Sequence, residues 1–339
     1  MALKLPYDLE EDILARVPWK YLATLRCVCK LWNSLILEER LNKKNLSFHM
    51  HSYSGEHRFI LKDTGPTISA VGIEEQKNVV DPPSLIVQDF TLIKARTCNP
   101  VRVYKTVHCD GLLLCVMDNQ LVVRNPLLKE TTWIKCGSDF HQRDDAYSLG
   151  YLSHCDYRIL RFRCASNSRI PSRVEVCEVA SKTWKVIDNI SFDWFLSVPL
   201  SILSLRGTPY CIGLREDHTA FVQSYDFYKE RFQPIDDLPF SYDELNPIAL
   251  EIYKGDRLSV LEQCHKTRKI CIWVKHWLML TLGPNWWSVI NDKEFQVIKA
   301  DEGECGFPFL CSYVPSFVRL PGFSKQDTSR IRWRKRRFN

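Results

Sequence analysis

Four short pairs of residues have side-chain types that could carry out chemistry. His108-Cys109 and Cys264-His265 combine a nucleophile with a base, or two metal ligands, whereas Asp144-Asp145 and Asp236-Asp237 are carboxylate pairs. Adjacent residues of a strand point to opposite faces, so neither histidine–cysteine pair can serve one site. The acidic pairs lie in turn-like sequence, and we expect them to be solvated loop residues.

No enzyme motif accompanies these pairs. The 339 residues contain no HExxH, CxxC or GxSxG pattern, and 13 glycines are few for a chain built around phosphate-binding loops. We therefore predict a protein that is not an enzyme and that binds no metal or cofactor. Its function has to be sought in the elements that could carry a binding surface.

The strongest pattern is an apolar repeat at helical spacing in the first forty residues. Pro6 precedes the expected first helix, Asp8 has the position of an N-cap, and Pro18 ends that helix. Apolar residues then recur at helical spacing up to Ile36. A module of about 45 residues buries too little surface to fold alone, so we expect it to need a neighbour. The plainer alternative is a helical hairpin that packs on the rest of the chain.

Residues 3–46 resemble the F-box. The matching segments are Leu5-Pro6-x-Asp8-Leu9, Ile13-Leu14, Val17-Pro18, Arg26–Trp32 and Leu35-Ile36. This resemblance implies a three-helix module that binds a Skp-type adaptor and, through it, the cullin and RING subunits of a ubiquitin ligase. The adaptor-binding residues that it implies are Leu5, Pro6, Leu9, Ile13, Leu14, Val17, Pro18, Leu22, Leu25, Val28 and Trp32.

After the helical module the pattern changes to short alternating runs that predict strands, such as Leu112–Val116 and Ile270–Val274. A polar turn followed by an aromatic residue recurs at intervals of about 50 residues, the length of a four-stranded propeller blade. We therefore predict a multidomain α+β protein in which the helices precede an all-β, kelch-like β-propeller. A two-sheet β-sandwich, with the repeat arising by chance, is the alternative. The repeated aromatic residues are Trp133, Trp184, Phe232 and Trp286 or Trp287.

Parts of the β region are similar to the F-box-associated domain of plant F-box proteins. The similarity rests on His108–Cys115, Val122–Pro126, Ile270–Val274 and Tyr313–Ser316. It implies the substrate-recognition subunit of an SCF-type E3 ubiquitin ligase, whose β domain recruits an unknown protein substrate. The alternative is a non-enzymatic propeller scaffold with a non-functional F-box.

The two resemblances divide the chain into four regions. They are the F-box at 3–46, a linker or irregular first repeat at 47–106, the F-box-associated domain at 107–320 and a basic tail at 321–339. The substrate-binding residues are unknown at this stage. We expect loops such as Ser138–Asp145 and Arg215–His218 to decide partner choice, because they interrupt the strand pattern with mixed charge.

Charge and composition narrow the function classes. The net charge of +6 equals the six basic residues of the last ten, so the rest of the chain has no basic field for nucleic acid. The tail is either a solvated end or a nuclear-import signal. We find no apolar run long enough for a membrane span and no signal peptide, which predicts the nucleus or cytoplasm. The 14 cysteines are then expected to be reduced core thiols.

Overall fold

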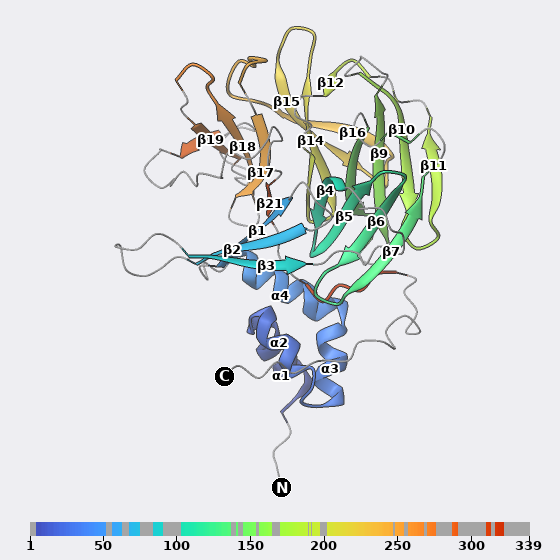
Figure 1. Ribbon diagram of the computed structural model, residues 1–339, viewed down its shortest axis with the longest axis vertical. Helices are drawn as coiled ribbons and strands as arrows, with labels where there is room; N and C mark the ends of the chain where they lie inside the picture. Colours follow the sequence, from blue (N-terminus) through green and yellow to red (C-terminus); the bar gives the residue numbers. More distant parts are fainter. Residues whose placement is uncertain are drawn as a thin grey trace.

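A computed structural model describes most of the helical module and the β domain. The described residues are 5–51, 56–62, 68–74, 84–90, 103–136, 140–141, 145–153, 156–164, 170–188, 190, 192–196, 202–246, 248–253, 257–267, 270–275, 287–290, 310–312 and 316–321. Four helices lie at one end of the molecule, and strands arranged in five antiparallel sheets form the rest (Figure 1).

The helical module contains α1 (Tyr7–Arg16), α2 (Trp19–Leu25), α3 (Lys30–Leu37) and α4 (Glu39–His51). The N-cap positions of α1 and α2 are held by Pro6 and Pro18, which lack the N–H that a helix start leaves unbonded. The prediction of Asp8 as an N-cap is wrong, because α1 begins at Tyr7, two residues earlier than an N-cap at Asp8 implies, and Asp8 lies in its first turn. There its negative charge still stabilises the helix by interacting with the positive, N-terminal end of the helix dipole.

A small core holds the four helices together. The fully buried side chains are Leu14, Leu22, Leu35, Ile36 and Leu41. Polar contacts join the helices around this core, since the Trp32 indole nitrogen donates to Glu10 and buried Glu11 pairs with Lys44 at 2.8 Å. The helices that the apolar spacing predicts are therefore present, with α4 as an additional element.

The β domain repeats a four-stranded antiparallel unit. One sheet contains β4 (Val103–Cys109), β5 (Leu112–Met117), β6 (Gln120–Asn125) and β7 (Glu130–Lys135), and the next β8 (Ala146–Tyr151), β9 (Tyr157–Cys164), β10 (Pro171–Glu178) and β11 (Thr183–Ile187). A third contains β12 (Phe195–Leu196), β13 (Ile202–Leu205), β14 (Thr208–Leu214), β15 (Ala220–Asp226) and β16 (Arg231–Asp237). The fourth contains β17 (Ile248–Tyr253), β18 (Arg257–Gln263), β19 (Ile270–Lys275) and β20 (Trp287–Ile290).

The fifth sheet joins the two ends of the β domain. It contains β1 (Glu56–Lys62), β2 (Ile68–Glu74) and β3 (Ser84–Phe90), and its remaining strand is β21 (Leu310–Ser312), which pairs with β1. Strands of different sheets also contact one another, as β4 does with β8, β13 and β21. Such a ring, closed by strands from both ends, confirms the propeller-like fold and excludes the β-sandwich.

The aromatic repeat marks equivalent strands. Trp133, Trp184, Phe232 and Trp287 lie on β7, β11, β16 and β20, each the last strand of its sheet in chain order. The residue just before β7, β11 and β16 has a positive φ in each case, which shows that the same turn type precedes these strands. The four aromatic residues therefore lie on corresponding strands, but only Trp184 and Phe232 hold the same position there. Trp133 lies two residues further along its strand, and Trp287 is the first residue of β20.

Apolar clusters fill the space between neighbouring sheets, and cysteines belong to them. Cys109 and Cys177 lie in the cluster between the β4–β7 and β8–β11 sheets, and Cys211 lies in the next. Burial raises the pKa of Cys115, Cys177 and Cys211 to about 12, so these thiols stay protonated at neutral pH. They pack as small apolar side chains.

The expectation that the acidic pairs are solvated is wrong for Asp145 and Asp236. Asp145 is fully buried, and its carboxylate accepts from the Arg161 guanidinium at 2.6 Å. Asp236 is buried on β16 and pairs with Lys275 of the neighbouring sheet. A buried carboxylate requires such a partner, and both partners are distant in sequence.

Candidate functional site

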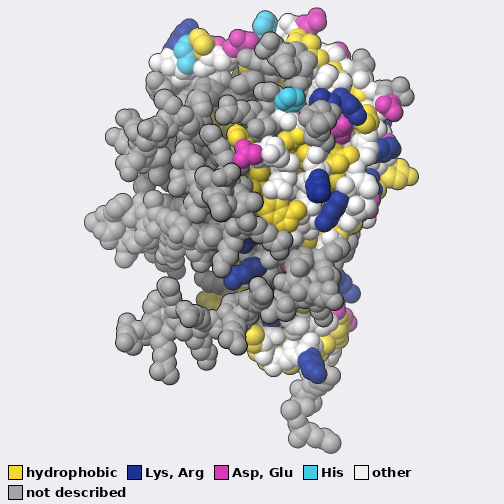
Figure 2. Space-filling view, turned by 45° about the vertical axis from the view of Figure 1, so that its right-hand side comes forward, with side chains coloured by type: hydrophobic (Ala, Val, Ile, Leu, Met, Phe, Trp, Pro, Cys, Tyr) yellow, Lys and Arg dark blue, Asp and Glu magenta, His cyan; other side chains and the backbone are white. Residues whose placement is uncertain are grey.

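Exposed apolar side chains gather on the helical module. Eleven large hydrophobic side chains are exposed among the described residues, and six of them lie within residues 5–28. Hydrophobic side chains are visible at this end of the molecule, at the bottom of Figure 2. An exposed apolar group of this kind indicates a protein-binding surface. We call it the helical apolar surface; its members are Leu5, Tyr7, Leu9, Ile13, Tyr21 and Val28.

The structure divides the predicted adaptor-binding residues by exposure. Leu5, Pro6, Leu9, Ile13 and Val28 are exposed, whereas Val17, Pro18, Leu25 and Trp32 are half-buried. Leu14 and Leu22 are fully buried in the helical core and have no surface to offer a partner in this arrangement.

Sequence reasoning missed two aromatic members of the helical apolar surface. Tyr7 and Tyr21 are 45% and 56% exposed, and the Tyr7 hydroxyl donates to Glu38 at 2.9 Å. Their position in the first turns of α1 and α2, just after Pro6 and Pro18, could have pointed to them.

The helical module also packs on the β domain. Leu127 and Leu128, in the turn between β6 and β7, and Phe317 all contact the helical core. The Arg26 guanidinium lies 5.7 Å from the centre of the Phe317 ring. In Figure 1 the red segment that contains Phe317 runs between the helices and the lower end of β6 and β7. We call this contact the joint; its residues are Leu127, Leu128 and Phe317.

A fully buried amide supports the joint. The Asn125 side-chain nitrogen donates to the carbonyl oxygens of Ser316 and Val318, at 2.9 and 2.6 Å. Its side-chain oxygen accepts from the backbone nitrogens of Leu127 and Leu128, at 2.9 and 3.1 Å. One side chain therefore shapes the β6–β7 turn and holds the segment that carries Phe317.

Gly111 lets a second turn approach the same segment. Its φ is +83°, and a Cβ at this position would lie 2.2 Å from the Ser316 hydroxyl oxygen. The Ser316 hydroxyl donates to the carbonyl of Asp110, and Glu130 accepts from the backbone nitrogen of Leu320 at 2.9 Å. Asp110, Gly111 and Asn125 thus all meet Ser316, although the sequence shows them only in separate motifs.

The histidine–cysteine pairs form no site with each other. His108 Nε2 accepts from the Gly111 backbone nitrogen at 2.8 Å and stabilises the β4–β5 turn, while Cys109 is buried. His265 lies beside Asn246, 2.9 Å from its side-chain oxygen. Within the described ranges, no three histidine, cysteine or acidic side chains gather as metal ligands, and no helix could cross a membrane.

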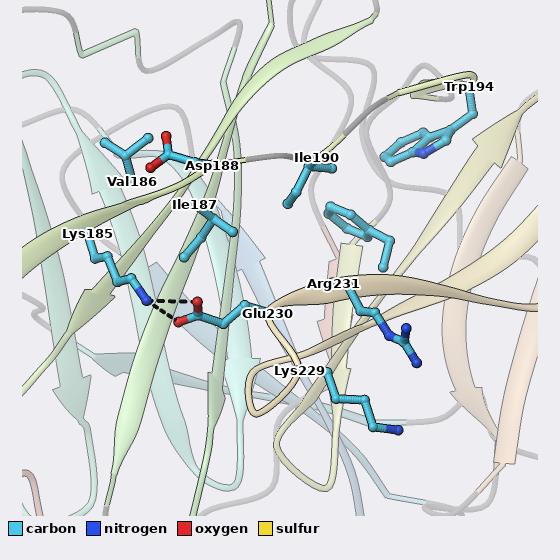
Figure 3. A pocket seen from close by; sticks show the side chains of 10 residues that line it. Lys185, Val186, Ile187, Asp188, Ile190, Trp194, Lys229, Glu230 and Arg231 are labelled. Carbon is cyan, nitrogen blue, oxygen red and sulfur yellow. Dashed lines mark hydrogen bonds and ion pairs between the residues drawn. The ribbon is translucent and has the colours of Figure 1, made fainter.

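The β domain is hollowed where the β8–β11 sheet meets the β12–β16 sheet. A groove of about 600 Å³ lies between β11 and β16, and Figure 3 shows the side chains that line it. A second groove of about 500 Å³ adjoins it. Volumes in this range suit a bound ligand or a segment of a partner protein. Of the two loops expected to decide partner choice, Arg215–His218 forms the exposed β14–β15 turn. Most of Ser138–Asp145 falls outside the described residues, and the expectation stays a prediction.

Both parts of the chain match known protein families. Residues 2–44 match the F-box domain, and residues 58–281 match the F-box-associated beta propeller domain. The chain is 38% identical over 291 residues to a candidate F-box protein of Arabidopsis thaliana, At3g16590, covering 81% of this chain and 74% of that protein. It is 31% identical over 309 residues to the F-box/WD-40 repeat-containing protein 1 of Arabidopsis thaliana, covering 88% of this chain and 70% of that protein.

Proposed function

This chain belongs to the F-box proteins that carry an F-box-associated β-propeller domain, and we propose that it is the substrate receptor of a Skp–cullin–F-box ubiquitin ligase. In this proposal the helical module binds a Skp-type adaptor, and the β domain recruits a protein substrate. The chain performs no chemical step itself. Ubiquitin transfer follows because the substrate is held close to the ligase enzymes.

The helical apolar surface is the observation that carries the proposal. Leu9 and Ile13 are spaced by four residues on one face of α1 and are 52% and 49% exposed. Burying such a side chain is worth about 1.5–3 kcal/mol before ordering costs. A few anchors of this kind are enough for stable binding, because interface energy concentrates in a small number of residues.

The joint gives the proposed receptor a fixed geometry. Phe317 is only 2% exposed, and it belongs to a segment that the buried Asn125 holds against the β domain. A substrate bound to the β domain would then keep a constant position relative to the adaptor. A constant position is what transfer by proximity requires.

Adaptor binding tests the proposal. We expect the full chain to co-purify with a Skp-type adaptor and Ile13→Asp to weaken binding more than tenfold, because a carboxylate would be desolvated in an apolar interface. Leu152→Asp is the matched control, since Leu152 is an exposed apolar residue of the β domain and its variant should bind as well as the wild type. Normal binding by Ile13→Asp would contradict the assigned surface.

A wild-type chain that binds no adaptor would instead support the scaffold with a non-functional F-box. We propose, with this role, that the protein acts in the nucleus or cytoplasm. The buried, protonated thiols are compatible with the reducing conditions of these compartments.

A further inference from the structure

We propose that the groove between β11 and β16 binds an extended segment of the recruited protein, with an apolar side chain at its centre and an acidic side chain toward Arg231. This inference rests on the proposed receptor function and names the substrate feature that the β domain would recognise. We call the site the edge groove. It is lined by Lys185–Asp188, Ile190, Trp194 and Lys229–Phe232.

The backbone geometry of the edge groove suits an extended chain. Consecutive residues of a strand point to alternate faces, so a hollow lined by four successive residues, Lys185–Asp188, must run along the edge of β11. Among the described strands, β11 and β16 each pair on one side only, with β10 and β15. Their outer edges therefore offer backbone N–H and C=O groups to an added strand.

The adjoining hollow extends this edge. Val174 of β10 pairs with Ile187, the last residue of β11, and β10 continues for three residues beyond that pair. Two of these residues, Ser172 and Arg173, line the adjoining hollow of about 500 Å³ together with Val186–Asp188. The two hollows share the end of β11, so a single extended segment can follow both.

An apolar floor lies in the middle of the edge groove. Ile187 is 7% exposed and Trp194 is 5% exposed, and the Trp194 and Phe232 rings meet edge to face with centroids 5.3 Å apart. These contacts hold the floor in place before a ligand binds. A rigid apolar floor selects for one bulky apolar side chain in the occupant.

The charges are arranged asymmetrically around this floor. Lys185 Nζ lies 2.7 Å from Glu230 Oε1, so these two charges satisfy each other. Among the described side chains, Arg231 and Asp188 have no ion-pair partner, and Figure 3 shows them at opposite ends of the groove. Lys229 lies on the same side as Arg231.

Charge complementarity defines the occupant. An acidic side chain can make a bidentate contact with the Arg231 guanidinium, and a basic one suits Asp188. The order acidic, apolar, basic along an extended segment therefore matches the groove. A nucleic acid does not match it, because Asp188 and Glu230 would repel its phosphates.

Selection of peptides by the full chain tests the edge groove. The probe is a displayed library of random nonapeptides, presented to the purified full chain. We expect enriched peptides to share an acidic and an apolar residue, and to lose enrichment on Arg231→Glu. No enrichment, or enrichment of peptides without an acidic residue, would overturn the proposal.

A charge exchange then tests the assigned orientation. For the most enriched peptide, fluorescence polarisation should show more than tenfold weaker binding to Arg231→Glu and recovery when the acidic residue of the peptide becomes Arg. Lys266→Glu, an exposed residue outside the groove with the same charge change, should leave binding unaltered. Equal binding by the wild type and Arg231→Glu would place the peptide elsewhere.

Backbone methylation tests the strand edge. We expect N-methyl groups at alternate peptide positions to weaken binding more than tenfold in one register and little in the other, because only every second N–H of an added strand faces β11. Equal effects in both registers would contradict strand addition. Adaptor co-purification is measured on the same samples, so a chain that selects peptides without binding adaptor would refute the receptor function and leave the edge groove intact.

Discussion

Shortening Phe317 tests whether the joint stabilises the helical module. The Phe317 ring is 2% exposed and packs among Leu14, Leu22 and Leu35, far in sequence from all three. Phe317→Ala removes this ring from a filled core, a change that costs about 3–5 kcal/mol when the surroundings do not collapse. The segment 316–320 can relax toward the helices, so this range is an upper bound.

Native-state hydrogen exchange is the assay, because it reports the opening free energy of each helix and strand separately. At about 1.4 kcal/mol per factor of ten, the loss corresponds to exchange roughly a hundred to several thousand times faster in α1–α4. Amides of β14 and β15 should keep their rates. Adaptor binding should persist under native conditions, because Leu9 and Ile13 are exposed and take no part in the joint.

Phe162→Ala is the control for a general loss of stability. Phe162 is 1% exposed and lies in the cluster between the β8–β11 and β12–β16 sheets. Its variant should therefore accelerate exchange in the strands of these two sheets and not selectively in the helices. Helical amides that keep wild-type rates in Phe317→Ala would refute the joint as a stabilising contact.

Two further predictions concern buried polar groups. Asn125→Leu should lower the free energy of unfolding, measured by urea titration, by about 2–4 kcal/mol, because the backbone groups that bond to Asn125 lose their partners. A loss below about 1 kcal/mol would show that water replaces the amide. The free energy of unfolding should also fall as pH rises above 9, by about 1.4 kcal/mol per pH unit for each of Cys115, Cys177 and Cys211. Each of these thiols has a pKa of about 12 in the folded protein, against a usual value of 9.0. Above pH 9 the unfolded chain therefore binds fewer protons than the folded protein, and unfolding becomes more favourable. Urea titrations between pH 8 and 11 check this slope, and replacing the three cysteines by Ala should reduce it; an unchanged slope would assign it to other groups.

The sequence by itself determined the order of elements and the family. Helix breaks at Pro6 and Pro18, the spacing of the apolar residues and the turn before each repeated aromatic residue all act over a few neighbouring positions. Such local signals survive in the sequence, which is why the three-helix start and the propeller repeat were predicted. The start of α1 was missed by two residues, because Asp8 suits both the cap and the first turn.

The tertiary structure decided which side chains reach the surface and which distant groups meet. Ile13 and Leu14 are adjacent and equally apolar, yet the first is 49% exposed and the second is fully buried, because only the packing of four helices defines the inner face. Asp145 and Asp236 are buried rather than solvated, since Arg161 and Lys275 reach them from other strands. The joint and the edge groove likewise combine residues that the chain separates by tens to hundreds of positions. Contacts over such separations depend on how strands and sheets pack together, which a local pattern does not encode.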